Sequence, residues 1–285
     1  MELAAHRCKP APVAGAHHGI LASSRTRGLS VTAPGTILIA INVAGVTCLP
    51  PVVSPPLVIA RAGVLLGPES PLEAIRAALA TGADAIRVDV GSDSDGVPIL
   101  LPNNAAGQPT DGQESLTLRE AIEEVRGRAL LDIEIREDGI EGEVAEAVRS
   151  LNAAGDAWIS SARAETLDAC KWIAPEIPRS LVFDGVGGDP SSFMLYALST
   201  LLLASFAPKA SYIEKNPAFV ELCQKRGVPC YTWAVDDPPL MQRMIDIEVD
   251  GIITNDPRAA RLLIHPEVAA SLEPVEETQA TTAHV

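Results

Sequence analysis

ALATGADAIRVDV, residues 78–90, decides the fold class of this 285-residue chain. Its first residues end a helical stretch, Pro71–Ala80, and its last six, Ala85–Val90, form a short and mostly apolar run that is typical of a strand. Nearly continuous apolar strands are typical of a parallel sheet that is buried on both faces. A helix followed so closely by such a strand predicts an α/β protein.

The same alternation of apolar runs and helical stretches continues outward, from residue 57 to residue 254. We expect strands at Leu57–Ala60, Ala85–Val90, Ala129–Ile135, Ala157–Ser160, Ser180–Phe183, Leu202–Phe206, Val228–Val235 and Asp250–Thr254. We expect helices at Pro71–Ala80, Thr117–Val125, Ile140–Asn152, Ala164–Ile173, Pro217–Arg226 and Pro238–Ile247, and a further helix start at Asp256–Pro257. Eight strands over about 210 residues fit a closed (β/α)8 barrel, whose active face lies at the carboxyl ends of the strands. An open, doubly wound sheet is the alternative.

Composition and charge narrow the class of protein. The hydrophobic fraction of 47% can fill a sizeable core. The net charge of −15 argues against a nucleic-acid partner, because phosphate contacts need clustered lysine and arginine. The five cysteines form no Cys-x-x-Cys pair, so we expect neither a zinc site nor a disulfide framework. Reduced thiols are compatible with a cytoplasmic protein.

The two ends of the chain differ from its middle. Residues 1–54 are rich in alanine, glycine, proline and serine and predict a flexible extension, within which residues 36–53 form a short apolar segment. This segment is shorter than the ~20 residues of a spanning helix, and it begins further along the chain than in an ordinary signal peptide. An export signal, a membrane anchor and an early start codon all stay open, and with them a cytoplasmic, exported or membrane-anchored location. Residues 266–285 predict a disordered acidic tail.

Seven segments carry a resemblance to a known family. They are PLVIARAG (56–63), GPES (67–70), ALATGADAIRVDV (78–90), DGVPILLPN (95–103), LLDIEIRE (130–137), GVPCYTWAVDDP (227–238) and VDGIITNDP (249–257). In this order and spacing they resemble the glycerophosphodiester phosphodiesterase family. The resemblance implies a TIM barrel of the phospholipase-C-like phosphodiesterase type over residues 55–265. It also implies a chemistry in which two histidines exchange protons and a carboxylate-held divalent cation neutralises the phosphoryl oxygens.

The residues at the family's two histidine positions cannot exchange protons. The first position falls on Arg61 and the second on Pro102, and the sequence has no histidine between His18 and His265. Arginine stays protonated at any working pH, and proline has no side-chain proton. We therefore expect no catalytic residue at either position.

The metal site that the resemblance implies is altered as well. Arg87 takes the place of one carboxylate ligand, whereas Asp89 and Glu134 match two others. Two carboxylates that face a guanidinium do not make the cage of several oxygens that a hard cation needs. We expect no cofactor, with Ca²⁺ or Mg²⁺ held by Asp89 and Glu134 only if the protein is active.

Five residues at matched positions would contact a ligand: Arg61, Glu69, Arg87, Arg136 and Trp233. Arginines at strand ends can bind a phosphate bidentately, which predicts a pocket for a small anionic or phosphorylated ligand. The alternative is that these arginines only neutralise neighbouring carboxylates. The tryptophan would either stack on a glycerol or sugar face or plug the barrel mouth.

Two functions of different classes are open. The first is a barrel of this family with a degenerate active site, which binds a phosphorylated or anionic ligand without turning it over. The alternative is an active phosphoric diester hydrolase that cleaves glycerophosphodiesters to glycerol 3-phosphate and an alcohol, with Glu69, Asp89 or Glu134 in place of the histidines. A membrane-tethered domain stays open as a third function if residues 36–53 associate with a membrane.

Overall fold

The computed structural model describes residues 55–62, 70–101 and 115–266, all of which belong to one unit of the chain, residues 49–285. The expected extension (1–54) and nearly all of the expected acidic tail (266–285) lie outside these residues, and so do Glu69 and Pro102. None of the described helices is long and apolar enough to span a membrane. The apolar segment 36–53 lies outside the described residues.

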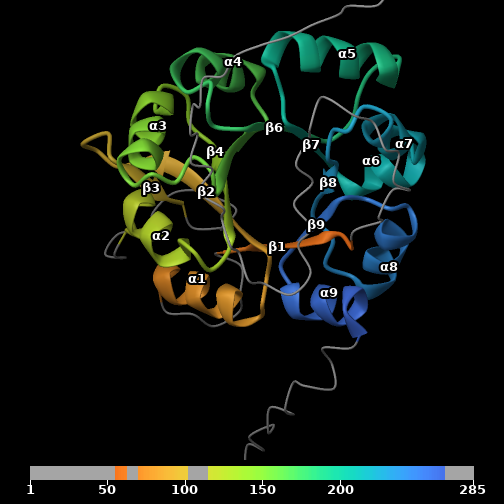
Figure 1. Ribbon diagram of the computed structural model, residues 1–285, viewed down its shortest axis with the longest axis horizontal. Coiled ribbons are helices and arrows are strands. Elements are labelled where there is room, and N and C mark those ends of the chain that lie inside the picture. Colours follow the sequence, from red (N-terminus) through yellow and green to blue (C-terminus); the bar gives the residue numbers. More distant parts are fainter. Residues whose placement is uncertain (1–54, 63–69, 102–114, 267–285) are drawn as a thin grey trace, which may run out of the picture. The chain divides into compact units, whose positions relative to one another are not determined.

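Eight parallel strands form a nearly closed barrel (Figure 1). They are β1 (Leu57–Arg61), β2 (Ala85–Ser92), β4 (Leu130–Ile135), β5 (Ala157–Ser161), β6 (Arg179–Phe183), β7 (Ser205–Pro208), β8 (Tyr231–Thr232) and β9 (Gly251–Thr254). The order around the barrel is β7-β6-β5-β4-β2-β1-β9-β8, and parallel bridges from Phe206 to Cys230 and from Lys209 to Trp233 bring β7 back to β8. The short strand β3 (Pro98–Leu100) pairs with β2 in antiparallel fashion. The predicted (β/α)8 TIM barrel is confirmed.

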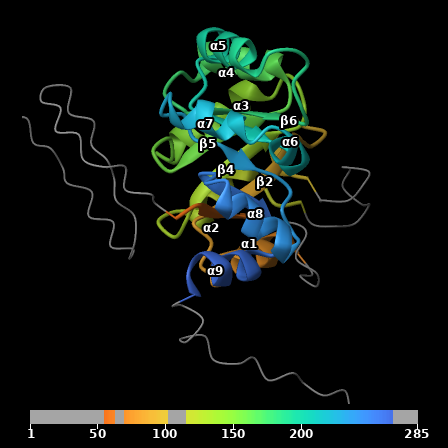
Figure 2. The same ribbon diagram turned by 90° about the vertical axis from the view of Figure 1, so that its right-hand side faces the viewer.

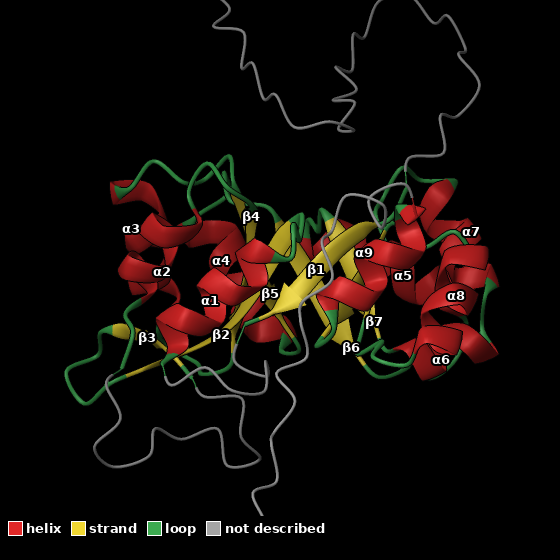
Figure 3. Ribbon diagram, turned by 90° about the horizontal axis from the view of Figure 1, so that it is seen from below, coloured by secondary structure: helices red, strands yellow, loops and turns green. Residues whose placement is uncertain are grey.

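Helices cover the outside of the strands, as the view from below shows (Figure 3). They are α1 (Pro71–Ala80), α2 (Leu118–Val125), α3 (Glu141–Ser150), α4 (Ala164–Ile173), α5 (Pro190–Leu201), α6 (Ala210–Lys215), α7 (Ala218–Gln224), α8 (Pro238–Asp246) and α9 (Pro257–Ile264). Several begin where a side chain accepts a backbone N–H and a proline follows, as at Asp237 before α8 and Asp256 before α9. The predicted helix start at Asp256–Pro257 is therefore confirmed.

One predicted strand is wrong in its position. The run Leu202–Phe206 was expected as a strand, but β7 begins at Ser205 and ends at Pro208. Leu202 instead ends α5 in the left-handed conformation, with a φ of 50°. Residues 202–204 therefore cap and follow a helix that the sequence had not indicated, and they connect it to β7.

Among the described residues, the first and last helices are neighbours beside β1. Figures 1 and 2 both place α1 next to α9. Arg261 of α9 binds Asp84 through contacts of 3.1 and 3.3 Å from Nη1 to the two carboxylate oxygens. Asp84 Oδ2 also accepts the backbone N–H of Val58 over 2.9 Å. The carboxylate at the start of β2 thus joins β1 to the final helix.

The strands separate two apolar clusters. Outward-facing side chains such as Val58, Ile86 and Ile133 pack with the helices into the outer core. Inward-facing side chains form a smaller inner core, made of Ile59, Ala85, Trp158, Val182, Ala207 and Ile253. Successive residues of a strand point to opposite faces, so the residues two and four places beyond Ala85 face inward as well. The inner core therefore continues into charged side chains toward the carboxyl ends of the strands.

Candidate functional site

The candidate site lies at the carboxyl ends of β1, β2 and β4, directly beyond the inner core. Parallel pairing aligns Arg61 of β1 with Arg87 of β2, and Arg87 with Asp132 of β4. It also aligns Asp89 of β2 with Glu134 of β4. Since residues two apart on a strand share a face, these five side chains converge on the barrel interior.

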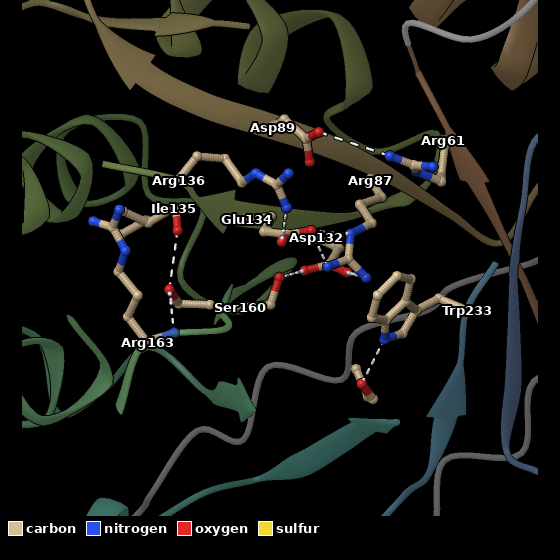
Figure 4. A network of polar contacts seen from close by, with 12 residues as sticks. Arg61, Arg87, Asp89, Asp132, Glu134, Ile135, Arg136, Ser160, Arg163 and Trp233 are labelled. Carbon is tan, nitrogen blue, oxygen red and sulfur yellow. Dashed lines mark hydrogen bonds and ion pairs between the residues drawn. The ribbon is translucent and has the colours of Figure 1, made fainter. Parts of the chain in front are cut away.

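Arg87 is the centre of the site. Its side chain is only 3% exposed, and its Nε donates a hydrogen bond of 2.8 Å to Glu134 Oε2. Its Nη2 donates to the same oxygen, and its Nη1 lies 3.5 Å from Asp132 Oδ2 (Figure 4). The guanidinium is therefore buried between two carboxylates of the neighbouring strand.

Two further arginines lie nearer to solvent. Arg136 Nη1 donates to Glu134 Oε1 over 2.5 Å, and half of the Arg136 side chain is exposed. Arg61 Nη2 lies 3.8 Å from Asp89 Oδ2, which makes this the loosest ion pair of the group. The cluster consists of three guanidinium groups and three carboxylates, so its charges cancel when all six groups are ionised.

The three carboxylates differ in how readily they hold a proton. Burial is the largest influence on each of them and favours the neutral form. At Asp132 burial outweighs Arg87 and the Ser160 hydroxyl, and it raises the pKa to about 6. At Asp89 burial and the charge of Glu134 raise the pKa, whereas at Glu134 the pKa is lowered because Arg87 and Arg136 outweigh burial. Glu134 is thus the firmly ionised member of the cluster.

Asp132 and Ser160 are members of the site that the sequence reasoning missed. Ser160 Oγ donates a hydrogen bond of 2.6 Å to Asp132 Oδ1, and both residues are buried. A signal for Asp132 was present, because it lies two residues before Glu134 in the strand LLDIEI and so must share its face. The serine has no comparable signal in the sequence.

The described side chains at the site do not make an open set of ligands for a divalent cation. Glu134 Oε2 accepts a hydrogen bond from Arg87 and Oε1 accepts one from Arg136, so both oxygens are already engaged by guanidinium groups. A hard cation such as Ca²⁺ needs six or more oxygen ligands. Among the described residues, no group of three or more histidine, cysteine, aspartate or glutamate side chains is placed to hold a metal ion.

Trp233 lies on the other side of the barrel mouth, directly after β8. Its Nε1 donates a hydrogen bond of 2.8 Å to the carbonyl oxygen of Ala207, which fixes the ring against β7. Lys209 Nζ lies 5.6 Å from the centre of that ring and 3.2 Å from Asp184 Oδ2. The sequence reasoning missed Lys209 because it placed the preceding strand three residues too early.

The chain is similar in sequence to known proteins. The family described as "Glycerophosphoryl diester phosphodiesterase family" matches residues 105–259, more than half of the chain. A glycerophosphodiester phosphodiesterase from Caldanaerobacter subterraneus is 28% identical in an alignment of 223 residues, and the match covers 67% of this chain and 89% of that protein.

Two solved structures share the fold. The crystal structure of a glycerophosphodiester phosphodiesterase from Parabacteroides distasonis has a TM-score of 0.63 and 20% identity, over 75% of this chain and 98% of that one. An Oleispira antarctica phosphodiesterase, in complex with its product sn-glycerol-3-phosphate, has a TM-score of 0.59 and 20% identity, over 73% and 96%. At such identities the likeness shows the fold alone.

Proposed function

The chain belongs to the glycerophosphoryl diester phosphodiesterase family, and on that premise we propose that its barrel binds a phosphorylated ligand without the family's two-histidine, metal-assisted hydrolysis. The proposed site is the mouth of the barrel at the carboxyl ends of β1, β2 and β4. Arg61 and Arg136 are the residues proposed to contact the phosphate, because guanidinium groups bind phosphate oxygens bidentately.

The position of Arg87 carries the proposal. A buried guanidinium already binds Asp132 and Glu134, and a second positive charge brought beside it would be repelled. The carboxylates that would attract a divalent cation are therefore already paired with a guanidinium group of the protein. By the family resemblance, the position of Arg87 is that of a metal-binding carboxylate, so the guanidinium takes over the neutralising role.

The lack of histidine supports the same proposal. No histidine occurs between His18 and His265. By the family resemblance, the two histidine positions fall on Arg61 and Pro102. A positioned acid or base contributes typically ~10²–10⁴ in rate, so a barrel without either should retain little hydrolysis.

An active hydrolase is the second candidate, and one observation favours it. The pKa of Asp89 is raised by burial and by the charge of Glu134, and Asp89 lies closer to the mouth than Asp132. A carboxyl group that keeps its proton can act as a general acid. Glu134 suits that role less, because Arg87 and Arg136 lower its pKa.

Two measurements on the same preparations test the proposal. Hydrolysis of glycerophosphoglycerol and glycerophosphocholine is followed with and without Ca²⁺ or Mg²⁺, for the wild type and for the double variant Asp89→Ala, Glu134→Ala. Binding of sn-glycerol 3-phosphate is measured by calorimetry for the wild type, for Arg136→Gln and for the matched control Arg128→Gln, an exposed arginine that binds Glu124 on α2.

We expect no hydrolysis above background in any sample. We also expect Arg136→Gln to weaken binding about tenfold and Arg128→Gln to leave it unchanged. Metal-dependent turnover that the double variant abolishes would overturn the proposal in favour of the active hydrolase. Absence of any binding by the wild type would overturn it as well.

A further inference from the structure

We propose that Lys209 makes the barrel mouth select phosphorylated ligands whose second group is neutral or acidic, such as a polyol, and reject those that carry a quaternary ammonium. This inference rests on the proposed function, because it concerns the ligand of the same site. It assigns a specificity-determining role to a residue on the side of the mouth opposite the arginine cluster.

The backbone around Lys209 directs its side chain to the mouth. Lys209 follows the last residue of β7, and the alternation Ser205, Ala207, Lys209 places it on the face that contributes Ala207 to the inner core. Its N–H donates to the carbonyl oxygen of Phe183 over 2.9 Å. The residue therefore has a fixed backbone position at the carboxyl end of β7.

The contacts of the Lys209 ammonium group define what the neighbouring aromatic face can still accept. Nζ lies 5.6 Å from the centre of the Trp233 ring, within the range of a cation–π interaction. The ring cannot easily turn away, because its Nε1 donates to the carbonyl oxygen of Ala207. A face of Trp233 is therefore already covered by a cation that belongs to the protein.

Quaternary ammonium ligands are recognised by aromatic faces of this kind. A choline group entering this mouth would meet the Lys209 ammonium at the tryptophan, and Arg61 and Arg136 on the opposite side. Asp184 Oδ2 lies 3.2 Å from Nζ and offsets part of this repulsion, but its side chain is 70% exposed, against 44% for that of Lys209, so water screens the charge of Asp184 more strongly. A glycerol or acidic group has no such conflict and can accept hydrogen bonds from Nζ.

The test compares two phosphate monoesters that share one anionic group and differ in the other. The affinities of sn-glycerol 3-phosphate, phosphocholine and inorganic phosphate are measured by calorimetry for the wild type, Lys209→Met, Lys209→Arg and Lys225→Met. Methionine keeps most of the aliphatic length and removes the charge. Lys225, an exposed lysine that binds Glu221 on α7, is the matched control.

We expect the wild type to bind sn-glycerol 3-phosphate about tenfold more tightly than phosphocholine. Lys209→Met should reduce this ratio at least threefold, whereas Lys209→Arg and Lys225→Met should retain it. Similar affinities of the wild type for the two esters, or an unchanged ratio in Lys209→Met, would overturn the inference and leave the proposed function standing. Failure of all three ligands to bind would overturn both.

Discussion

The wall of the barrel built from β2 and β4 differs from the wall built from β7 and β8 in what its inward-facing side chains bind. On the first wall, Arg87, Asp132 and Glu134 bind one another in a buried cluster of charges. On the second, Trp233 is held by a backbone carbonyl and faces the partly exposed Lys209. The first wall therefore has its central ion pairs buried, whereas the ion pair of the second wall, Lys209 with Asp184, lies near solvent.

Removal of the Arg87 guanidinium should lower the free energy of unfolding more than any other change on the two walls. Arg87→Ala leaves Asp132 and Glu134 buried without their main partner, which costs about 3–5 kcal/mol of unfolding free energy. Urea denaturation at pH 7 measures the loss, with Arg128→Ala as the control for an exposed ion pair. A loss of less than about 1 kcal/mol, equal to that of the control, would contradict the central role of Arg87.

Protonation of Asp132 should have the next largest effect on the free energy of unfolding. Its pKa of about 6 in the folded protein lies above the ordinary value of 3.8, so between these two pH values the folded state binds more protons than the unfolded state. The free energy of unfolding should therefore fall as the pH rises from about 4 to about 6, by about 2–3 kcal/mol from this group. Asp132→Asn should flatten that part of the stability profile, as measured by denaturation at a series of pH values. An identical slope in the variant would show that Asp132 is not the group responsible.

A substitution on the wall built from β7 and β8 should change the free energy of unfolding least. Trp233→Phe removes the hydrogen bond from Nε1 to the carbonyl oxygen of Ala207 but keeps an aromatic ring, so the expected loss of unfolding free energy is about 1 kcal/mol. The same urea titration measures it. A loss as large as that of Arg87→Ala would remove the proposed difference between the two walls.

The sequence indicated the architecture better than it indicated the site. The outward faces of strands such as β2 and β4 are apolar enough for these strands to be recognised without knowledge of their partners. Asp256 marks the start of α9 by its cap. The segment before β7 misled the prediction, because a short apolar run can end a buried helix as readily as it forms a strand. Leu202 ends α5 in a left-handed conformation that its residue type does not favour.

The sequence predicted some members of the site, but not Asp132 and Ser160 and not the pairing of the charged groups. The resemblance brought Arg61, Arg87, Asp89 and Glu134 together, yet the choice of Glu134 as the partner of both Arg87 and Arg136 depends on side-chain geometry. The raised pKa of Asp132 depends on complete burial, which arises only once the barrel has formed. Whether a ligand is contacted by the five residues predicted for it stays a prediction; they are Arg61, Glu69, Arg87, Arg136 and Trp233.

The contact between Arg261 and Asp84 joins residues 177 positions apart, and β1 pairs with β9 along the same seam. During synthesis the ribosome releases the chain from its amino end, so β1 must wait for nearly the whole barrel before its second neighbour exists. Until then its edge offers unpaired N–H and C=O groups to any other extended chain. Such a long wait slows folding and lengthens exposure to aggregation. Premature stops or slow translation before residue 251 should therefore yield insoluble, incomplete barrels that aggregate through the unpaired edge of β1.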